Sequence, residues 1–155
     1  MVGRKQYVSV EGCDSGLAAV TSGVPQGSLL GPVLFVIYIN DMTKVVKHSK
    51  IKLYADDAKI YFSYDKDESV DAFLSDISSV YEWAINMQLS VALQKCSVLN
   101  IGRQSDMSDV NINGVSIPSV SSMRDLGVII SCNLKFGQHY ETISKRALVL
   151  VNLIF

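Results

Sequence analysis

The run from Leu29 to Ile39 constrains the fold most strongly, because apolar residues cover every side of the helix that it predicts. A helix that is hydrophobic all round has to be buried, whereas an amphipathic helix can lie at a surface. Ser28 can cap the start of this helix, and Pro32 comes early enough to be tolerated in its first turn. Gly31 and Pro32 break the run, which is also too short to span a bilayer. The sequence therefore predicts a buried helix in a globular protein that does not span a membrane.

The composition places the chain among globular proteins. Its 155 residues are the length of one domain, and 48% hydrophobic against 19% charged residues exclude a disordered segment. The formal net charge of −1 excludes the strongly cationic modules that bind nucleic acid through charge alone. Three cysteines form no Cys-x-x-Cys pair, and no apolar segment follows the N-terminus. We therefore expect an intracellular protein, cytoplasmic or nuclear, without a disulfide scaffold or a signal peptide.

Periodicity along the chain predicts both helices and strands. Alternating apolar residues predict short hairpins, helical spacing predicts helices, and Asn113-Gly114 is a strong hairpin-turn signal. The predicted hairpins lie at residues 7–21, with a turn at 11–16, and 51–62; the predicted helices at 29–39, 67–89 and from about 139 onward; and strand-like pieces at 97–101, 110–112, 115–117 and 126–130. This mixture predicts an α+β fold.

Two adjacent carboxylates, Asp56 and Asp57, lie where the two strands of the hairpin at residues 51–62 meet. A tight turn can direct both side chains toward one point, although neighbours in a strand face opposite ways. A divalent cation relieves the repulsion between two such charges, and Mg²⁺ is commonly bound by one or two carboxylates together with substrate phosphates and water. An Asp-Asp pair is also a common polar turn, so the pair alone leaves both interpretations open.

Several segments in order resemble the sequence blocks of reverse transcriptases, and most closely those of retrotransposons without long terminal repeats. The second and third blocks resemble TSGVPQGSLLGPVLFVIYINDM at residues 21–42 and LYADDAKIY at 53–61. The hairpin before them resembles GRKQYVSVEG at 3–12, and the fourth block resembles WAINMQLSVALQKCSVLNIG at 83–102. The stretch leading into the thumb resembles INGVSIPSVSSMRDLGVIIS at 112–131 and HYETISKRA at 139–147. The resemblance thus covers essentially the whole chain.

This resemblance implies a polymerase palm-like antiparallel sheet with packed helices, followed by the beginning of a helical thumb. It implies that Asp56 and Asp57 are catalytic metal ligands, with Asp56 the main bridge between the ions. In the family's reaction the primer 3′-hydroxyl attacks the α-phosphate of a deoxynucleoside triphosphate. One Mg²⁺ activates the hydroxyl and a second, about 3.5–4 Å away, steadies the leaving pyrophosphate. The implied partners are an RNA template, a DNA primer and deoxynucleoside triphosphates, without a membrane.

The resemblance also assigns residues that contact nucleotides. Tyr54 and Ala55 would lie beside the primer end, where a small residue leaves room for the sugar. Pro25, Gln26 and Gly27 would lie against the incoming nucleotide and its template base. The backbone freedom of glycine and the helix start that follows suit close approach of an anionic ligand. A strand tyrosine, a core alanine and a plain capped helix start remain the structural alternatives.

Lys95 is the third catalytic candidate, because it matches the fourth-block lysine that is proposed to protonate the departing pyrophosphate. The family often has asparagine where Ala92 stands, so this chain departs from the pattern there. Two further basic groups are candidates for phosphate contact, with a solvated surface as the alternative. They are Lys44, Lys47, His48, Lys50 and Lys52 in one stretch, and Tyr140, Lys145 and Arg146 on the predicted thumb helix.

No segment matches the first block of the family, which supplies the third catalytic aspartate. Glu11, Asp14 and Asp41 precede the Asp-Asp pair but do not occupy matching positions. We therefore expect residues 1–130 to form a partial palm without the first catalytic block and fingers, and residues 131–155 a truncated start of the thumb. With two of three carboxylates, we expect magnesium to be held weakly and the fragment to be inactive alone, because the missing palm and fingers residues are needed.

Other interpretations stay open at this stage. The chain can be a non-catalytic remnant of the palm that binds nucleic acid or protein, a remnant without function, or a mis-cut gene model. An unrelated Mg²⁺-dependent phosphotransfer enzyme is a further class, but His48 and His139 have no obvious catalytic partners in the sequence.

Overall fold

A computed structural model of the chain describes residues 3–25, 27–63, 70–102 and 110–154. Its helices and strands confirm the predicted α+β class. The strands are β1 (Lys5–Gln6), β2 (Ser9–Val10), β3 (Cys13–Asp14), β4 (Ala18–Ala19), β5 (Lys50–Tyr54), β6 (Asp57–Tyr61), β7 (Val98–Leu99), β8 (Val110–Ile112), β9 (Val115–Ile117), β10 (Ser119–Val120), β11 (Ser122–Asp125) and β12 (Val128–Ser131). The helices are α1 (Leu30–Ile39), α2 (Val70–Asn86) and α3 (Gly137–Ile154), with short 3-10 helices η1 (Asn40–Lys44) and η2 (Leu93–Lys95).

The described strands pair two by two, whereas a palm is expected to have a continuous antiparallel sheet. The antiparallel pairs are β1–β4, β2–β3, β5–β6, β8–β9 and β11–β12, and β7 pairs with β10 in parallel. The strands are only two to five residues long, and in β2–β3, β5–β6, β8–β9 and β11–β12 short turns join sequence neighbours as local hairpins. The pairing thus supports the α+β class and does not by itself identify a palm.

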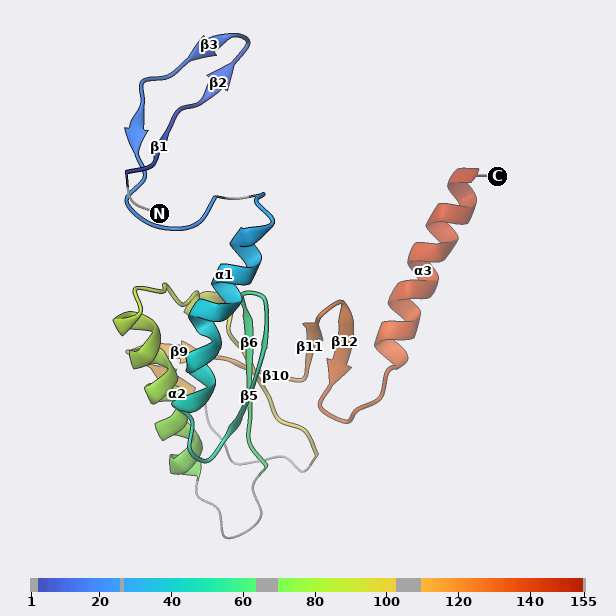
Figure 1. The fold of residues 1–155 in the computed structure, drawn as a ribbon. Coiled ribbons are helices and arrows are strands. Elements are labelled where there is room, and N and C mark those ends of the chain that lie inside the picture. Colours follow the sequence, from blue (N-terminus) through green and yellow to red (C-terminus); the bar gives the residue numbers. More distant parts are fainter. Residues whose placement is uncertain (1–2, 26, 64–69, 103–109, 155) are drawn as a thin grey trace.

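The N-terminal hairpin is confirmed, but its turn is tighter than the predicted 11–16. β2 pairs with β3, and the chain reverses at Glu11 and Gly12, whose φ angles are 52° and 81°. Two positive φ angles in a two-residue loop match the twist of the flanking strands. Figure 1 shows this hairpin extending beyond the N-terminal end of α1. Arg4 ties it to the loop before α1 by donating from Nη2 to the Gly23 carbonyl at 2.6 Å.

The prediction that the helix at Leu29–Ile39 is buried is wrong. Only Gly31 and Ile39 of α1 are buried, whereas Leu30 and Ile37 are each 66% exposed. A helix that is apolar all round needs neighbours on every side, and the described elements cover α1 on one side only. The C-terminal turn of α1 is attached to the end of α2, because the Tyr38 hydroxyl donates to the main-chain carbonyl of Met87.

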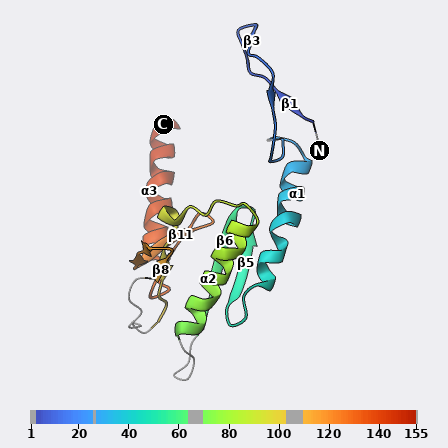
Figure 2. The same cartoon turned by 90° about the vertical axis from the view of Figure 1, so that its left-hand side faces the viewer.

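A small apolar core lies between α2, η2 and the β8–β9 hairpin. Leu93, Val110 and Ile117 are buried there, and half-buried side chains of α2, including Leu74 and Ile77, pack against them. The predicted Asn-Gly turn of this hairpin is confirmed, with positive φ at both positions. Figures 1 and 2 show α2 running beside the β5–β6 hairpin.

The helix predicted at 67–89 is confirmed in its described part as α2, while residues 67–69 lie outside the described residues. It ends in a turn where Gln88 has φ 56°, Gln88 N–H donates to the Ile85 carbonyl and Leu89 N–H to the Ala84 carbonyl. These two bonds satisfy the last carbonyl groups of the helix in the manner of a Schellman motif. The helix thereby stops before η2.

Asp76, on α2, is the largest fully buried side chain of the described residues, at 2% exposure. Its carboxylate accepts three backbone N–H bonds from the segment that enters β5: Lys47 at 2.9 Å, His48 at 2.8 Å and Ser49 at 2.6 Å. Burial alone would raise the pKa of Asp76, but these N–H groups favour the ionised form and lower its pKa to about 2. The carboxylate therefore fixes the start of the β5–β6 hairpin to α2.

The C-terminal region differs from the predicted strand at 126–130. Leu126 and Gly127 form the turn between β11 and β12, with φ 45° and 92°, and the second strand begins at Val128. The predicted C-terminal helix is confirmed as α3, whose far half extends away from the other elements in Figure 1. Among the described residues, none of the helices has the length and apolar character that crossing a membrane requires.

Asp76→Asn is expected to lower the free energy of unfolding by about 2 kcal/mol at pH 7, because a pKa lowered from 3.8 to about 2 corresponds to that difference. The folded-state pKa lies below the unfolded one, so this stabilisation is complete above about pH 4 and is lost as the pH falls through about 2. Urea unfolding of both proteins at pH 7 and pH 3 measures the effect. Glu82→Gln, an exposed acid on the same helix, is the matched control and should change stability by less than about 0.5 kcal/mol.

Candidate active site

The β5–β6 hairpin carries Asp56 and Asp57 at its closed end. Tyr54 pairs with Asp57, so Ala55 and Asp56 form the two-residue turn and Asp57 is the first residue of β6. Ala55 has φ 50°, a left-handed conformation that costs a non-glycine residue roughly 1–2 kcal/mol. Both carboxylates are exposed, so the turn presents adjacent negative charges to solvent.

One face of this hairpin, which we call the outer face, is polar and exposed. Because residues opposite each other in an antiparallel pair share a face, Tyr54 and Asp57 lie together on it. The residues of the outer face are Lys50, Lys52, Tyr54, Asp57, Lys59 and Tyr61, and all six are exposed. On the other face Ile51, Leu53 and Ile60 are half-buried, as the predicted alternation requires.

The loop that leads into α1 lies toward the same end of the molecule as the Asp-Asp turn (Figures 1 and 2). Pro25 and Gly27 are exposed, with Gly27 at φ 80°, and Gln26 lies outside the described residues. The predicted capping role of Ser28 is confirmed in part, because its hydroxyl accepts the Gly31 N–H at 3.0 Å, although α1 begins at Leu30. The same hydroxyl donates to the Pro25 carbonyl at 2.8 Å.

Gly31 is a functional candidate that the sequence does not single out. A Cβ at this buried position would lie 3.0 Å from Ser28 Oγ and 3.2 Å from the Pro25 carbonyl oxygen. A side chain there would crowd both oxygen atoms, whose hydrogen bond folds the loop onto the first turn of α1. The sequence marks the position only as a break in an apolar run, because a close backbone approach leaves no pattern in the sequence.

Lys95 ends η2 and is exposed. Figure 1 and Figure 2 place η2, which follows α2, toward the same end of the molecule as the Asp-Asp turn. Its catalytic role stays a prediction. Ala92 immediately precedes η2, where its carbonyl accepts the Lys95 N–H at 2.9 Å.

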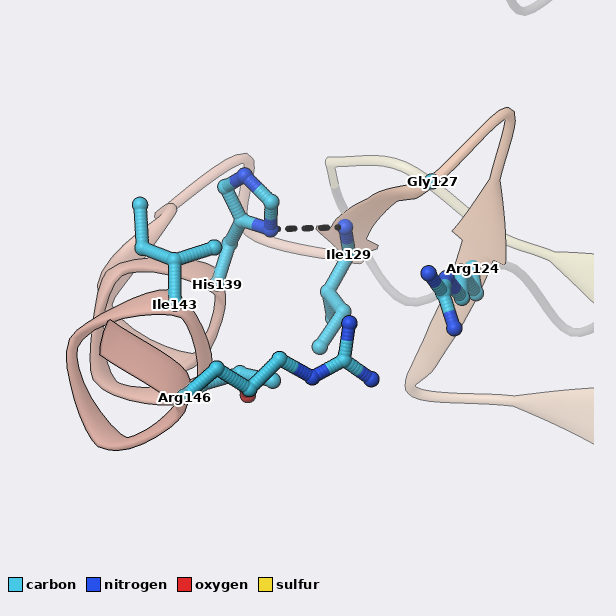
Figure 3. A pocket seen from close by; sticks show the side chains of 7 residues that line it. Arg124, Gly127, Ile129, His139, Ile143 and Arg146 are labelled. Atoms are coloured by element: carbon cyan, nitrogen blue, oxygen red, sulfur yellow. Dashed lines mark hydrogen bonds between the residues drawn. The ribbon is translucent and has the colours of Figure 1, made fainter. Parts of the chain in front are cut away.

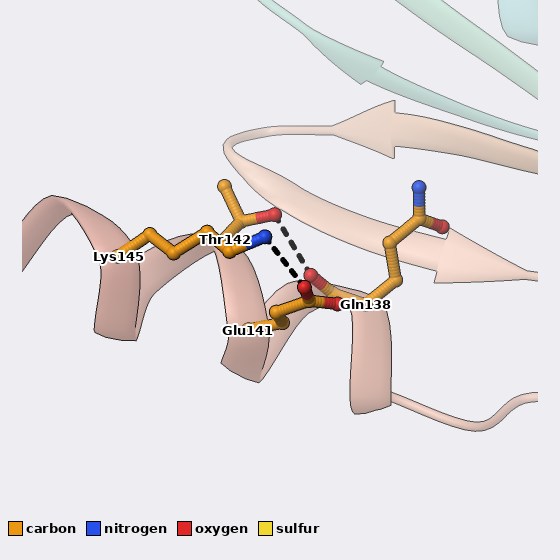
Figure 4. A network of polar contacts seen from close by, with 4 residues as sticks. All are labelled: Gln138, Glu141, Thr142 and Lys145. Carbon is orange, nitrogen blue, oxygen red and sulfur yellow. Dashed lines mark hydrogen bonds and ion pairs between the residues drawn. The ribbon is translucent and has the colours of Figure 1, made fainter.

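The other basic residues that are candidates for phosphate contact lie in different environments. The stretch around Lys47 and His48 uses its backbone to bind Asp76, which favours the interpretation as a structural connection. Lys145 pairs with Glu141 on α3 at 2.6 Å, and Arg146 turns toward the β11–β12 hairpin (Figures 3 and 4). The predicted duplex-contacting residues of α3 therefore do not form one group.

The carboxylates at the turn have the chemistry that magnesium requires, but the described residues place only two there. Within residues 3–25, 27–63, 70–102 and 110–154, no group of three or more metal-ligating side chains occurs. Glu11, Asp14 and Asp41 are not brought to the turn as a third ligand. Two exposed adjacent carboxylates fit part of a Mg²⁺ site, whose other ligands are commonly phosphate and water.

The family is shown by comparison of sequences. The family described as reverse transcriptase (RNA-dependent DNA polymerase) matches residues 3–130, so the chain belongs to the reverse transcriptase family. The predicted domain boundary near residue 130 stays a prediction.

The relatives come from mobile elements of insects. The chain is 32% identical over 150 residues to the RNA-directed DNA polymerase from mobile element jockey of Drosophila funebris, and 30% identical over 154 residues to that of Drosophila melanogaster. These alignments cover 91% and 92% of this chain, which spans 16% of the length of each relative. A type-1 retrotransposable element R1 polyprotein of Nasonia vitripennis is 28% identical over 127 residues, covering 76% of this chain and 31% of that protein. No solved structure matches.

Ala55→Gly is expected to raise the free energy of unfolding by roughly 0.5 kcal/mol, because removing Cβ relieves the left-handed strain by more than the extra chain entropy of glycine costs. Ala58→Gly, three residues further on in β6, is the control and should lower stability by roughly 0.5–1 kcal/mol. Urea unfolding of both variants measures the two effects. Equal losses of stability in the two variants would show that Ala55 is not strained.

Proposed function

We propose that this chain carries two of the acids that perform nucleotidyl transfer in an RNA-directed DNA polymerase. Asp56 and Asp57 would act where a DNA primer, paired with an RNA template, receives a deoxynucleoside triphosphate. One observation carries the proposal: in a member of the reverse transcriptase family, the β5–β6 turn exposes Asp56 and Asp57 at adjacent chain positions, toward the end of the molecule where the loop enters α1 (Figures 1 and 2).

The carboxylates fit the part of metal ligands, with Mg²⁺ as the ion. When bound, Mg²⁺ would neutralise phosphate charge and favour ionisation of the primer hydroxyl. Asp56, in the turn, and Asp57, in the first position of β6, would hold it from adjacent positions of one rigid hairpin. A constellation on a strand turn is placed more accurately than one on a long loop, because the ladder fixes its backbone.

The outer face of the hairpin supports a nucleic acid strand as the partner. Lys50 and Lys52 provide positive charge along β5, whereas Lys59 is paired with Asp125, and Tyr54 provides an aromatic ring that is 65% exposed next to Asp57. Basic and aromatic side chains together are typical of surfaces that track a phosphate backbone and stack on bases. A binding remnant without catalysis would use this same face, so metal binding and primer extension have to be measured separately.

Mn²⁺ binding to the purified chain tests the metal site. We expect Asp56→Asn and Asp57→Asn each to weaken Mn²⁺ binding by about tenfold, because one unit charge beside a divalent ion is worth roughly 1–2 kcal/mol in water. Electron paramagnetic resonance of free Mn²⁺ measures the affinity. Asp41→Asn is the matched control, since Asp41 is an exposed acid that pairs with Lys44 instead. A loss in Asp41→Asn as large as in the turn variants would contradict the proposed site.

Primer extension tests the activity in a chimera, since the chain spans 16% of the length of the jockey polymerase. The chain replaces the matching segment of the Drosophila funebris protein, and extension of a DNA primer on an RNA template is measured with Mg²⁺. We expect extension by the chimera, and a loss of about a hundredfold or more for Asp56→Asn, with a similar loss for Lys95→Ala if Lys95 acts as the general acid. An active chimera that tolerates Asp56→Asn would contradict the proposed function.

A further inference from the structure

Residues 5–19 form a two-stranded ribbon, which we call the N-terminal ribbon, that projects beyond α1 (Figures 1 and 2). β1 and β2 lie on one side of it and β3 and β4 on the other. Every residue of the ribbon is exposed, including Tyr7 at 56%, Val8 at 65% and Val10 at 62%. A ribbon of two strands is only marginally stable by itself, so it would gain stability from pairing with further strands.

The β1–β2 side of the ribbon has an open edge of main-chain groups. Val8 bonds inward, because its carbonyl accepts the Ser15 N–H at 2.8 Å and its N–H donates to Ser15 Oγ at 2.9 Å. Inward and outward groups alternate along an antiparallel strand, so the N–H and carbonyl groups of Lys5, Tyr7 and Ser9 point outward. The described residues place no third strand beside them.

This open edge is complementary to itself. Two copies can pair through it in an antiparallel manner about a two-fold axis, which joins the same surface of both copies and closes the assembly. The register that overlaps residues 5–11 completely has Val8 on the axis and places Tyr7 opposite Ser9 of the second copy. Both of these residues have outward main-chain groups, so each such pair exchanges two hydrogen bonds.

The charges on the open edge favour this register. Lys5 lies near its start and Glu11 in the turn at its end, and neither forms an ion pair with another described residue. With Val8 on the axis, Lys5 lies opposite Glu11 of the second copy, and symmetry repeats this attraction. A shift of two residues keeps the main-chain groups matched but places Lys5 opposite Ser9 or beyond the turn, so the attraction is lost.

The apolar side chains of the ribbon are consistent with the same pairing. Val8 and Val10 lie on one face of the ribbon, because side chains two residues apart in a strand point the same way. In this register Val8 meets Val8 of the second copy as a non-hydrogen-bonded pair, in which side chains approach most closely. Such cross-strand pairs of β-branched residues stabilise a sheet. The paired ribbons would form a four-stranded sheet with four valines on one face.

We propose that the open edge of the N-terminal ribbon, residues 5–11, is an interface between two copies of this chain. The second copy supplies the strand that satisfies the outward main-chain groups, and the Lys5–Glu11 pairs set the register. An exposed edge otherwise invites pairing with unrelated strands, and pairing with a second copy removes that hazard. The inference goes beyond the proposed nucleotidyl transfer and does not depend on it, since the ribbon contains none of the acids of the Asp-Asp turn.

Sedimentation equilibrium of the purified chain at low salt tests the interface. We expect a reversible dimer with a dissociation constant of about 10–100 μM, because one strand edge is smaller than a standard interface. Lys5→Glu and Glu11→Lys each place like charges opposite each other twice, so each variant should dimerise about tenfold more weakly. An equal mixture of the two variants restores both attractions in a heterodimer, which should form within about threefold of the wild-type affinity.

Disulfide formation tests the register. Val8→Cys, combined with Cys13→Ser to remove the exposed native thiol, places two thiols on the axis with Cα atoms about 4.5 Å apart, as a disulfide requires. Val10→Cys with Cys13→Ser is the matched control, because its two thiols would be four residues apart along the strands, roughly 13 Å. We expect oxidation in a glutathione buffer to link the first variant and not the second, as measured by non-reducing electrophoresis.

Four results would overturn the proposal. They are a monomer at every concentration, association that Lys5→Glu and Glu11→Lys both retain, a mixture of these variants that stays monomeric, and equal disulfide yields from Val8→Cys and Val10→Cys. Association through the exposed apolar residues of α1 would give the second result, because it does not depend on the charges at positions 5 and 11.

Discussion

The position of the β5–β6 hairpin depends on one buried carboxylate. Asp76 reaches from α2 to three consecutive N–H groups immediately before β5, and no cation accompanies it among these contacts. A buried charge is tolerated in this way only when oriented dipoles replace the water that it loses. Since the apolar core is small, these three hydrogen bonds are an important restraint on the position at which the hairpin starts. The Asp-Asp turn follows after the five residues of β5, so its position depends on where β5 starts.

Local patterns predict the elements whose pairing is local. Strict alternation at residues 51–62 predicts β5 and β6 with the correct faces, and Asn113-Gly114 predicts the turn between β8 and β9. The role of Asp76 is not predictable in this way, because its partners lie 27 to 29 residues away and an acid on a helical pattern resembles a solvated one. The predicted burial of α1 is wrong, since a sequence pattern shows that a helix needs cover but not whether these residues provide it.

In the candidate site, too, features set by local sequence are predictable and long-range contacts are not. The adjacency of Asp56 and Asp57 at a hairpin end follows from their place between two alternating strands, so it is predictable. The approach of Arg146 to the β11–β12 hairpin (Figure 3) is not, because it joins a helix to a hairpin that lies earlier in the sequence. The helical pattern groups Arg146 with Lys145, whose carboxylate partner lies one helical turn away. Only the fold shows that Lys145 is paired, whereas Arg146 forms no ion pair with another described residue.

The ion pair between Lys59 and Asp125 links the β5–β6 hairpin, which carries the Asp-Asp turn, to the β11–β12 hairpin. Lys59 is two residues from Asp57 along β6, and Asp125 adjoins Arg124 along β11. Through this contact, the position of the β11–β12 hairpin bears on the strand that begins with Asp57. The Lys59 side chain is about half exposed, so high ionic strength would weaken this ion pair and with it the link between the two hairpins.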